Sequence, residues 1–324
     1  MNLALAMNMP GGTRHTLTAD DIYDCAGNII DEAYNAAEFA LPEVADRNDV
    51  VINEVLFNPT STGVDFVEVY NRSAKYINLN GWTLANVRGD SLYDLEVVTQ
   101  ENVLLPPASY LVLVEDANIL KGEYVNGKEN VFFETDLPSM PDDEGVVVVV
   151  DHAGSAIDSL SYTEDWHSPF LRDVEGISLE RIHFEGPTDD PSNWRSASSA
   201  VGYATPGYVN SNVVDENTLV ESIVVEPEVF APNAGQSGFT LIHYDFEKGG
   251  LVANIRILDP YGREIKRIAN NVLLGTEGFF RWDGDREDGQ PARIGPYMVL
   301  VQIFSEDGLV RTKKLRIAIA GDFR

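Results

Sequence analysis

The stretch Asp65-Phe66-Val67-Glu68-Val69-Tyr70 decides the fold class of this 324-residue chain. Its spacing places Val67 and Val69 on one face of an extended strand, because successive side chains of a strand point to opposite faces. The same period of two continues through residues 251–258 and 297–304, and the uninterrupted apolar run 146–150 predicts a strand buried on both faces. Turns rich in Gly, Asn, Asp and Pro separate these segments at intervals typical of a sandwich or barrel. The sequence therefore predicts an all-β protein.

Helices are expected to contribute little. No long segment has the 3.6-residue apolar period of an amphipathic helix. The best short helical candidate is Ala33–Leu41, a stretch that fits a linker equally well.

The charge of the chain is strongly negative and unevenly distributed. It has 23 Lys and Arg against 52 Asp and Glu, a net charge of −29 with a sequence pI near 4.3. Residues 1–47 carry −6, residues 48–212 carry −19 and residues 213–324 carry only −4. This break supports a domain boundary near 213, so we expect a leading piece at 1–47 and domains at 48–212 and 213–324. A chain of this charge repels nucleic acid and anionic membrane surfaces.

Cysteine content and the N-terminus bear on the compartment. The single cysteine, Cys25, excludes an intrachain disulfide and a thiolate metal cage. No apolar run approaches the roughly 20 residues of a membrane span, so no membrane insertion is expected. The first residues lack a basic region, a long apolar stretch and a cleavage site. Either the protein is cytosolic, or the chain is part of a longer exported protein whose signal lies upstream.

The middle region resembles a bacterial lamin tail domain, an Ig-like β-sandwich. The matching segments occur in the order of that family and span nearly all of 50–212; they are Val51–Pro59, Asp65–Asn71, Asn78–Leu84, Leu105–Leu113, Gly176–Arg181, Asn193-Trp194 and Ala204–Gly207. The Asn-Gly-Trp turn offers a left-handed backbone position and an aromatic ring for one end of a sandwich. Glu68 and Glu180 fall within strands, where we expect them to serve as structural polar partners for backbone or Arg groups.

The regions on either side resemble other Ig-like domains. Residues 223–320 are similar to the Ig-like domain of flagellar hook-capping proteins, on the strength of Ile255–Ile265, Gly278–Gly284, Asp288-Gly289 and Gly295–Tyr297. Residues 1–47, with Asp24-Cys25-Ala26-Gly27-Asn28, resemble the final strands of a preceding bacterial Ig-like domain. The expected fold is therefore a tandem array of Ig-like β-sandwiches, of which this chain is a fragment.

One acidic loop is a candidate calcium site. Asp283, Asp285 and Asp288 alternate within a compact turn, and Ca²⁺ prefers several carboxylate oxygens on such a loop. The loop departs from the EF-hand pattern, because Asp288 stands where Gly is required and Ile294 where Glu is required. A second acidic turn, at 142–144, has the same composition, and solvated charge is the simpler explanation for both.

Catalytic motifs are not found. The five histidines never occur in zinc-binding spacing, and there is no nucleophile elbow, P-loop or dinucleotide fingerprint. His167, Ser168 and Asp173 are close in sequence beside Trp166, but neighbours on a loop do not converge as triad residues must. Trp82, Trp194 and Trp282 lie in the family motifs as core residues, which leaves Trp166 as the candidate for ligand stacking.

These observations favour a non-catalytic protein. The resemblance implies a structural or adhesion module of a secreted or cell-surface bacterial protein, often one exported by type IX secretion. Its partners would be proteins or polysaccharides at the cell surface, not nucleic acid, and the chain is expected to be a monomer without a cofactor. The alternative is a calcium- or carbohydrate-binding accessory region of a secreted hydrolase. An enzyme of unfamiliar type ranks third.

Overall fold

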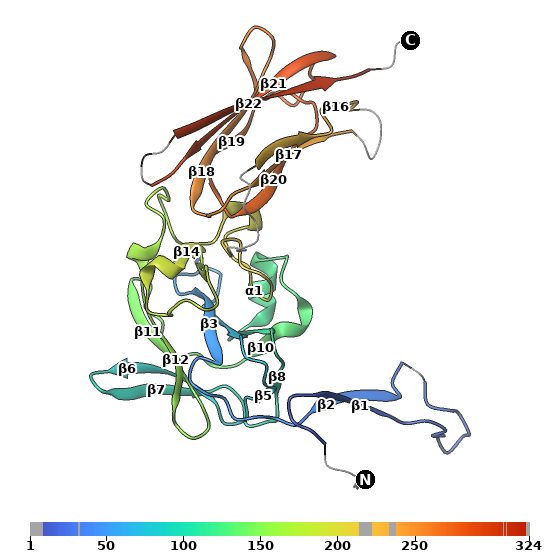
Figure 1. The fold of residues 1–324 in the computed structure, drawn as a ribbon, viewed down its shortest axis with the longest axis vertical. Coiled ribbons are helices and arrows are strands. Elements are labelled where there is room, and N and C mark those ends of the chain that lie inside the picture. The colour runs from blue at the N-terminus through green and yellow to red at the C-terminus, as the bar shows by residue number, and fades with distance from the viewer. Residues whose placement is uncertain are drawn as a thin grey trace.

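The computed structural model describes residues 9–31, 33–213, 222–232, 238–306, 308 and 310–321. These residues form a projecting two-stranded hairpin followed by two β-sandwiches that lie end to end along the long axis (Figure 1). The predicted all-β fold with tandem sandwiches is confirmed.

The N-terminal hairpin pairs β1 (Arg14–Thr18) with β2 (Ala36–Ala40) in antiparallel register, from Arg14 opposite Ala40 to Thr18 opposite Ala36. The helix considered for Ala33–Leu41 is therefore wrong, because β1 supplies the backbone partners that a strand needs. The hairpin buries little apolar surface, and Tyr34 is 81% exposed. A two-stranded sheet with so little covered surface is only marginally stable by itself.

The first sandwich has a six-stranded sheet in the order β10-β9-β4-β3-β13-β14 and a four-stranded sheet in the order β12-β11-β6-β7, with a short β5-β8 pair beside them. Its strands are β3 (Val50–Leu56), β4 (Phe66–Asn71), β5 (Ile77–Asn78), β6 (Thr83–Arg88), β7 (Ser91–Val97), β8 (Leu104–Leu105), β9 (Tyr110–Val114), β10 (Phe132–Glu134), β11 (Glu144–Val150), β12 (Ala156–Thr163), β13 (Leu179–Arg181) and β14 (Trp194–Ser196).

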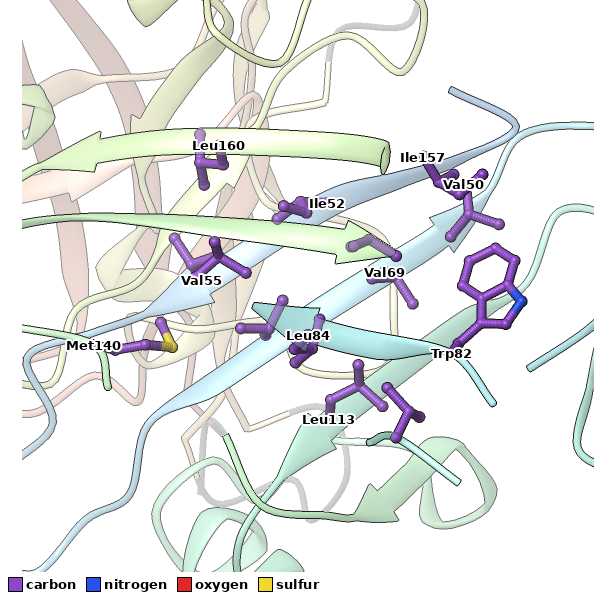
Figure 2. Packing of buried hydrophobic residues seen from close by; sticks show 14 of the residues in the cluster. Val50, Ile52, Val55, Val69, Trp82, Leu84, Leu113, Met140, Ile157 and Leu160 are labelled. Carbon is purple, nitrogen blue, oxygen red and sulfur yellow. The ribbon is translucent and has the colours of Figure 1, made fainter. Parts of the chain in front are cut away.

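The core of this sandwich lies between the two sheets. Figure 2 shows Ile52, Val69, Leu84 and Leu113 from β3, β4, β6 and β9 converging on it. The run 146–150 is buried on both faces, as predicted: its odd-numbered valines pack in this core and its even-numbered valines pack on Ala85. The indole rings of Trp82 and Trp194 are also buried in the core, as their motifs predict.

A buried ion pair connects the two sheets. Asp158 on β12 and Arg181 on β13 approach to 3.6 Å, and the Ile52 amide donates to Asp158 while Arg181 Nε donates to the Ile52 carbonyl. Burial raises the pKa of Asp158 and lowers that of Arg181 to about 10, so desolvation opposes both charges. Removing one partner would leave the other buried and unpaired, which is the costly change at such a site.

Helical structure in the first sandwich is short, and the sequence patterns did not predict it. The α-helix α1 (Ala117–Glu123) begins at Asp116, whose carboxylate accepts hydrogen bonds from the Asn118 and Ile119 amides. Such a cap satisfies donors at the start of a helix. Four 3₁₀ turns occupy Glu129–Val131, Glu164–Trp166, Pro191–Asn193 and Ser199–Val201. No helix within the described ranges is long and apolar enough to cross a membrane.

The second sandwich packs a three-stranded sheet, β15-β17-β20, on a five-stranded sheet, β16-β22-β21-β18-β19. Its strands are β15 (Ser222–Glu226), β16 (Val229–Phe230), β17 (Thr240–Asp245), β18 (Leu251–Leu258), β19 (Glu264–Leu274), β20 (Glu277–Trp282), β21 (Gly295–Phe304) and β22 (Val310–Ile319). Trp282 is fully buried in a core separate from the first, as its motif predicts.

Truncating a core leucine should separate buried from exposed positions. Leu160 is fully buried in the first core, so Leu160→Ala should lower the free energy of unfolding of this sandwich by about 2–5 kcal/mol. Leu95→Ala is the matched control, because Leu95 is 53% exposed and its truncation should cost less than about 0.5 kcal/mol. Urea denaturation measures both, and equal losses would contradict the assigned core.

Candidate functional site

Three glutamates lie side by side on adjacent strands of the six-stranded sheet. Glu54 on β3 stands opposite Glu68 on β4 and also opposite Glu180 on β13. All three side chains are 0% exposed. Like charges placed directly opposite one another destabilise a sheet, and burial adds to that cost. This row of carboxyl groups is the most demanding electrostatic feature of the first sandwich.

The row faces away from the core between the sheets. Val67 and Val69, which flank Glu68, pack in that core, so Glu68 points to the opposite face. Residues 203–213, which we call the closing segment, contribute most of the polar groups that contact the row on this face.

The closing segment donates hydrogen bonds to all three carboxyl groups. Glu54 accepts from the Thr205 amide at 2.8 Å, and Glu68 accepts from the Gly207 amide at 2.5 Å. Glu180 accepts from the Ser211 amide at 3.0 Å and the Ser211 hydroxyl at 2.8 Å. Further donors are the side chains of Asn53, Ser178 and Asn212. Each carboxyl group thereby exchanges water for fixed donors.

Burial favours the protonated form of these carboxyl groups by raising the pKa of each. Burial raises the pKa of Glu54 well above its usual value, and the charges of Glu180 and Glu68 raise it further. Burial raises the pKa of Glu68 to about 8, against the hydrogen bonds from Asn53 and Gly207. The Thr205 hydroxyl lies 3.0 Å from a Glu54 oxygen and 2.7 Å from a Glu180 oxygen, although it has one proton to give. A protonated carboxyl group as the second donor satisfies this arrangement.

Glycine is required where the closing segment turns over the row. Gly207 has a φ of +86°, and a Cβ there would lie 2.3 Å from Val131 Cγ2. Only glycine meets both conditions without strain. The Ala-Thr-Pro-Gly motif of the sequence therefore positions the Thr205 and Gly207 amides over the carboxyl groups.

The far end of the closing segment reaches the second sandwich. The Ser211 carbonyl accepts a hydrogen bond of 2.8 Å from the Thr276 amide, and Ser199 Oγ donates to the Leu273 carbonyl at 2.7 Å. Gly275 permits this contact, because a Cβ there would lie 2.3 Å from the Ser211 carbonyl oxygen. The residues that bind Glu180 are thus continuous with the joint between the two sandwiches.

The predicted calcium residues lie elsewhere, and each is paired with a cation. Asp283 accepts from Arg281, Asp285 pairs with Lys266, and Asp288 lies 3.2 Å from Arg286. No group of three or more acidic, His or Cys side chains in the described part of the chain is arranged to hold a metal ion. The structure thus does not bring these three carboxylates together as ligands.

His167 and Ser168 are held in place by hydrogen bonds to Ser196. His167 Nδ1 and Ser196 Oγ are hydrogen-bonded at 2.9 Å, and the Ser168 amide donates to the same oxygen. Burial lowers the pKa of His167 to about 4, which keeps the ring neutral. Trp166 is half-buried and packs against the core beside Trp194, with ring centroids 6.4 Å apart; ligand stacking at this residue stays a prediction. The Asp143 carboxylate of the second acidic turn accepts from the Glu144 amide.

Sequence reasoning identified Glu68 and Glu180 as structural polar partners but missed Glu54. The signal was present, because Glu54 interrupts the apolar strand 50–56 in the same way as Glu68 interrupts 66–70. The sequence does not show the register of β3 with β4 and β13, which places the three side chains opposite one another.

The pKa of Glu68 predicts the direction of a pH effect. Its pKa is about 8 in the folded chain against an ordinary 4.5, so the folded state retains a proton that the unfolded state loses. This stabilisation is complete below about pH 4.5 and is lost as the pH rises to about 8. His167 acts oppositely, but only below its ordinary pKa of 6.5. The melting temperature should therefore fall from pH 6.5 to pH 9, and Glu68→Gln should make that fall smaller. The exposed Glu101→Gln serves as control; equal slopes in all three proteins would contradict the assignment.

Calcium binding at Asp283, Asp285 and Asp288 stays a prediction from the sequence. It expects millimolar CaCl₂ to raise the melting temperature by binding the native state, EGTA to reverse the rise, and Asp285→Asn to abolish it. The matched control is Asp142→Asn in the other acidic turn. Since Ca²⁺ must displace the cations that now pair with these carboxylates, an unchanged melting temperature would remove the site.

Comparisons with solved structures give low similarity. CopC from Methylosinus trichosporium OB3b aligns at 18% identity over 32% of this chain and 100% of its own, with a TM-score of 0.22. Dimeric latent PorU from Porphyromonas gingivalis aligns at 13% over 84% of this chain and 20% of its own, with a TM-score of 0.24. A Ca²⁺-stabilized adhesin, which helps an Antarctic bacterium bind ice, aligns at 13% over 95% and 81%, with a TM-score of 0.19. Scores this low carry no argument about fold or function.

The comparison with protein families gives a more specific result, whereas that with curated proteins gives no match. Residues 43–164 match the family model described as Lamin Tail Domain. The match starts near the predicted boundary at 48 and includes Glu54 and Glu68, but it ends before Glu180 and the closing segment. The expected resemblance of the middle region to the lamin tail domain is therefore confirmed over residues 43–164.

Proposed function

We propose that the chain is a non-catalytic structural module that holds two β-sandwiches in a fixed relation, as part of a secreted or cell-surface bacterial protein. The observation that carries this proposal is the closing segment. It satisfies the buried glutamates of the first sandwich at one end, and at the other end its Ser211 carbonyl accepts a hydrogen bond from the Thr276 amide of the second sandwich.

The chemistry of the glutamate row supports a structural role. A catalytic carboxyl group must reach its substrate, directly or through one water molecule. Glu54, Glu68 and Glu180 are fully buried, and the chain itself provides their hydrogen-bond partners. The Lamin Tail Domain match at 43–164 agrees with this, because the resemblance implies an Ig-like module without catalysis.

The contacts at the joint support a fixed relation between the sandwiches. A Cβ on Gly275 would meet the Ser211 carbonyl oxygen at 2.3 Å, and one on Gly249 would meet Asn212 Oδ1 at 1.9 Å. The contact at Gly275 is between two backbones, and close packing of this kind resists relative movement of the two segments. Spacing of binding modules at a cell surface, the setting that the lamin tail resemblance implies, requires such stiffness.

Distance measurements between spin labels test the proposed stiffness. In a Cys25→Ser background, labels at Asp90→Cys and Asn270→Cys should give one narrow distance distribution, because the joint holds the sandwiches in place. Adding Gly275→Ala should broaden it, since the new Cβ separates the backbones at Ser211.

The control is Gly122→Ala, because Gly122 has a negative φ and open space around its Cα. A broad distribution in the parent protein would refute the fixed relation. Turnover of polysaccharide, peptide or phosphoester substrates that is lost in Glu54→Gln would refute the non-catalytic role.

A further inference from the structure

The outer face of the five-stranded sheet in the second sandwich is basic. Lys314 on β22 stands opposite Leu300 on β21, Leu300 opposite Arg256 on β18, and Arg256 opposite Arg267 on β19. Arg316 lies two residues further along β22, on the same side as Lys314. We call Arg256, Arg267, Lys314 and Arg316 the basic face; with adjacent strands about 4.8 Å apart, its row of cations spans about 14 Å.

The pleat of the sheet places these side chains away from the core. Val299 and Val301 of β21 are buried between the sheets, so Leu300 between them points outward together with Lys314. Lys314 and Arg316 are exposed to solvent. The surface is thus a flat sheet face that combines cations with the half-buried side chain of Leu300.

The positive charge of this face is only partly compensated. Glu264 lies 2.9 Å from Arg267 and 3.9 Å from Arg256. Lys314 and Arg316 have no ion pair with any described residue. The Glu287 carboxylate also accepts a hydrogen bond from the Arg267 amide at 3.0 Å, so four cations against two carboxylates leave a net charge of +2 here, in a chain whose total is −29.

The first sandwich carries the complementary surface. Asp65, Glu115, Asp142 and Asp143, which we call the acidic cluster, have no cation within ion-pair distance among the residues described. Burial and, after it, the negative charges of Asp142 and Glu115 together raise the pKa of Asp65 to about 7. One Asp65 oxygen is buried without a hydrogen-bond partner. Both observations indicate a surface that a cation would stabilise.

We infer that the basic face of one molecule binds the acidic cluster of a second copy of this chain, head to tail. Within one described chain, no ion pair joins the two surfaces, so each is available to another molecule. A contact between two different patches of identical molecules is heterologous and continues into a linear array unless rotation closes a ring. This association goes beyond the structural role proposed above. It differs from the monomer that the sequence predicts.

Local complementarity can outweigh the repulsion between two chains of −29. At 0.15 M salt, charges more than about 8 Å apart are largely screened, whereas opposed side chains at a contact are not. Arg and Lys against carboxylates form charge-assisted hydrogen bonds, which are the stronger kind. Association should accordingly persist at 0.15 M NaCl and weaken at 0.5 M NaCl.

Sedimentation velocity over a range of protein concentrations tests this inference. The parent chain should form concentration-dependent dimers and longer species at 0.15 M NaCl. Lys314→Glu/Arg316→Glu should raise the dissociation constant at least about tenfold, because the new glutamates repel the acidic cluster. The matched control is Arg311→Glu/Lys313→Glu, which reverses two charges on the same strand. These residues pair with Ile303 and Val301, so they lie on the other face of the sheet. It should change association less than about twofold.

Mixing two variants separates a lost contact from a misfolded protein. Asp142→Lys/Asp143→Lys should also be monomeric alone, because its acidic cluster is reversed. A one-to-one mixture with Lys314→Glu/Arg316→Glu should regain association, since each partner retains one original surface and the two reversed surfaces are again complementary.

Other outcomes would overturn the inference. A parent chain that stays monomeric at 0.15 M NaCl at every concentration would do so, and so would a mixture that does not associate. Binding of a sulfated polysaccharide by the basic face without self-association would assign the surface to a different partner. The spin-label distances within one chain report on the proposed function separately.

Discussion

The first sandwich depends on compensating three carboxyl groups that its own strands bury opposite one another. Glu54, Glu68 and Glu180 are aligned by the register of β4, β3 and β13, so no rotamer change can separate them fully. Their desolvation and mutual repulsion are offset by amide and hydroxyl donors from the closing segment. Leaving such groups without partners would cost about 1–3 kcal/mol each, and more if charged. The same donors hold the closing segment where its Ser211 carbonyl meets the second sandwich.

Much of the fold follows from local sequence patterns, because strand periodicity and turn residues act over short distances. The alternation in 65–70, the valine run 146–150 and the three motif tryptophans all lie where the sequence predicted. The exceptions required information from elsewhere in the chain. Ala36–Ala40 is a strand because β1 pairs with it, and α1 forms where Asp116 caps a short segment that lacks a long apolar period.

The candidate site was less predictable for the same reason. Glu68 and Glu180 stand out in their strands as single residues, but only the register shows that Glu54 lies between them. The acids at 283, 285 and 288 suggested a cation site by composition. Arg281 and Arg286 stand two residues from Asp283 and Asp288 in the sequence, whereas Lys266 reaches Asp285 only through the fold of β19 beside the loop after β20. The net charge of a domain likewise does not predict how its charges are distributed, because the second sandwich, with a net charge of −4, still presents a face of four cations.

The closing segment also determines when the first sandwich can finish folding. Its donors lie at 203–213, whereas the match to the Lamin Tail Domain ends at 164. During synthesis from the N-terminus, β3, β4 and β13 emerge before the residues that cover their glutamates. The row must therefore stay hydrated or protonated until the last residues of the domain arrive. Completion of the first sandwich is thereby tied to the arrival of the closing segment, whose Ser211 carbonyl meets the Thr276 amide only once the second sandwich has formed.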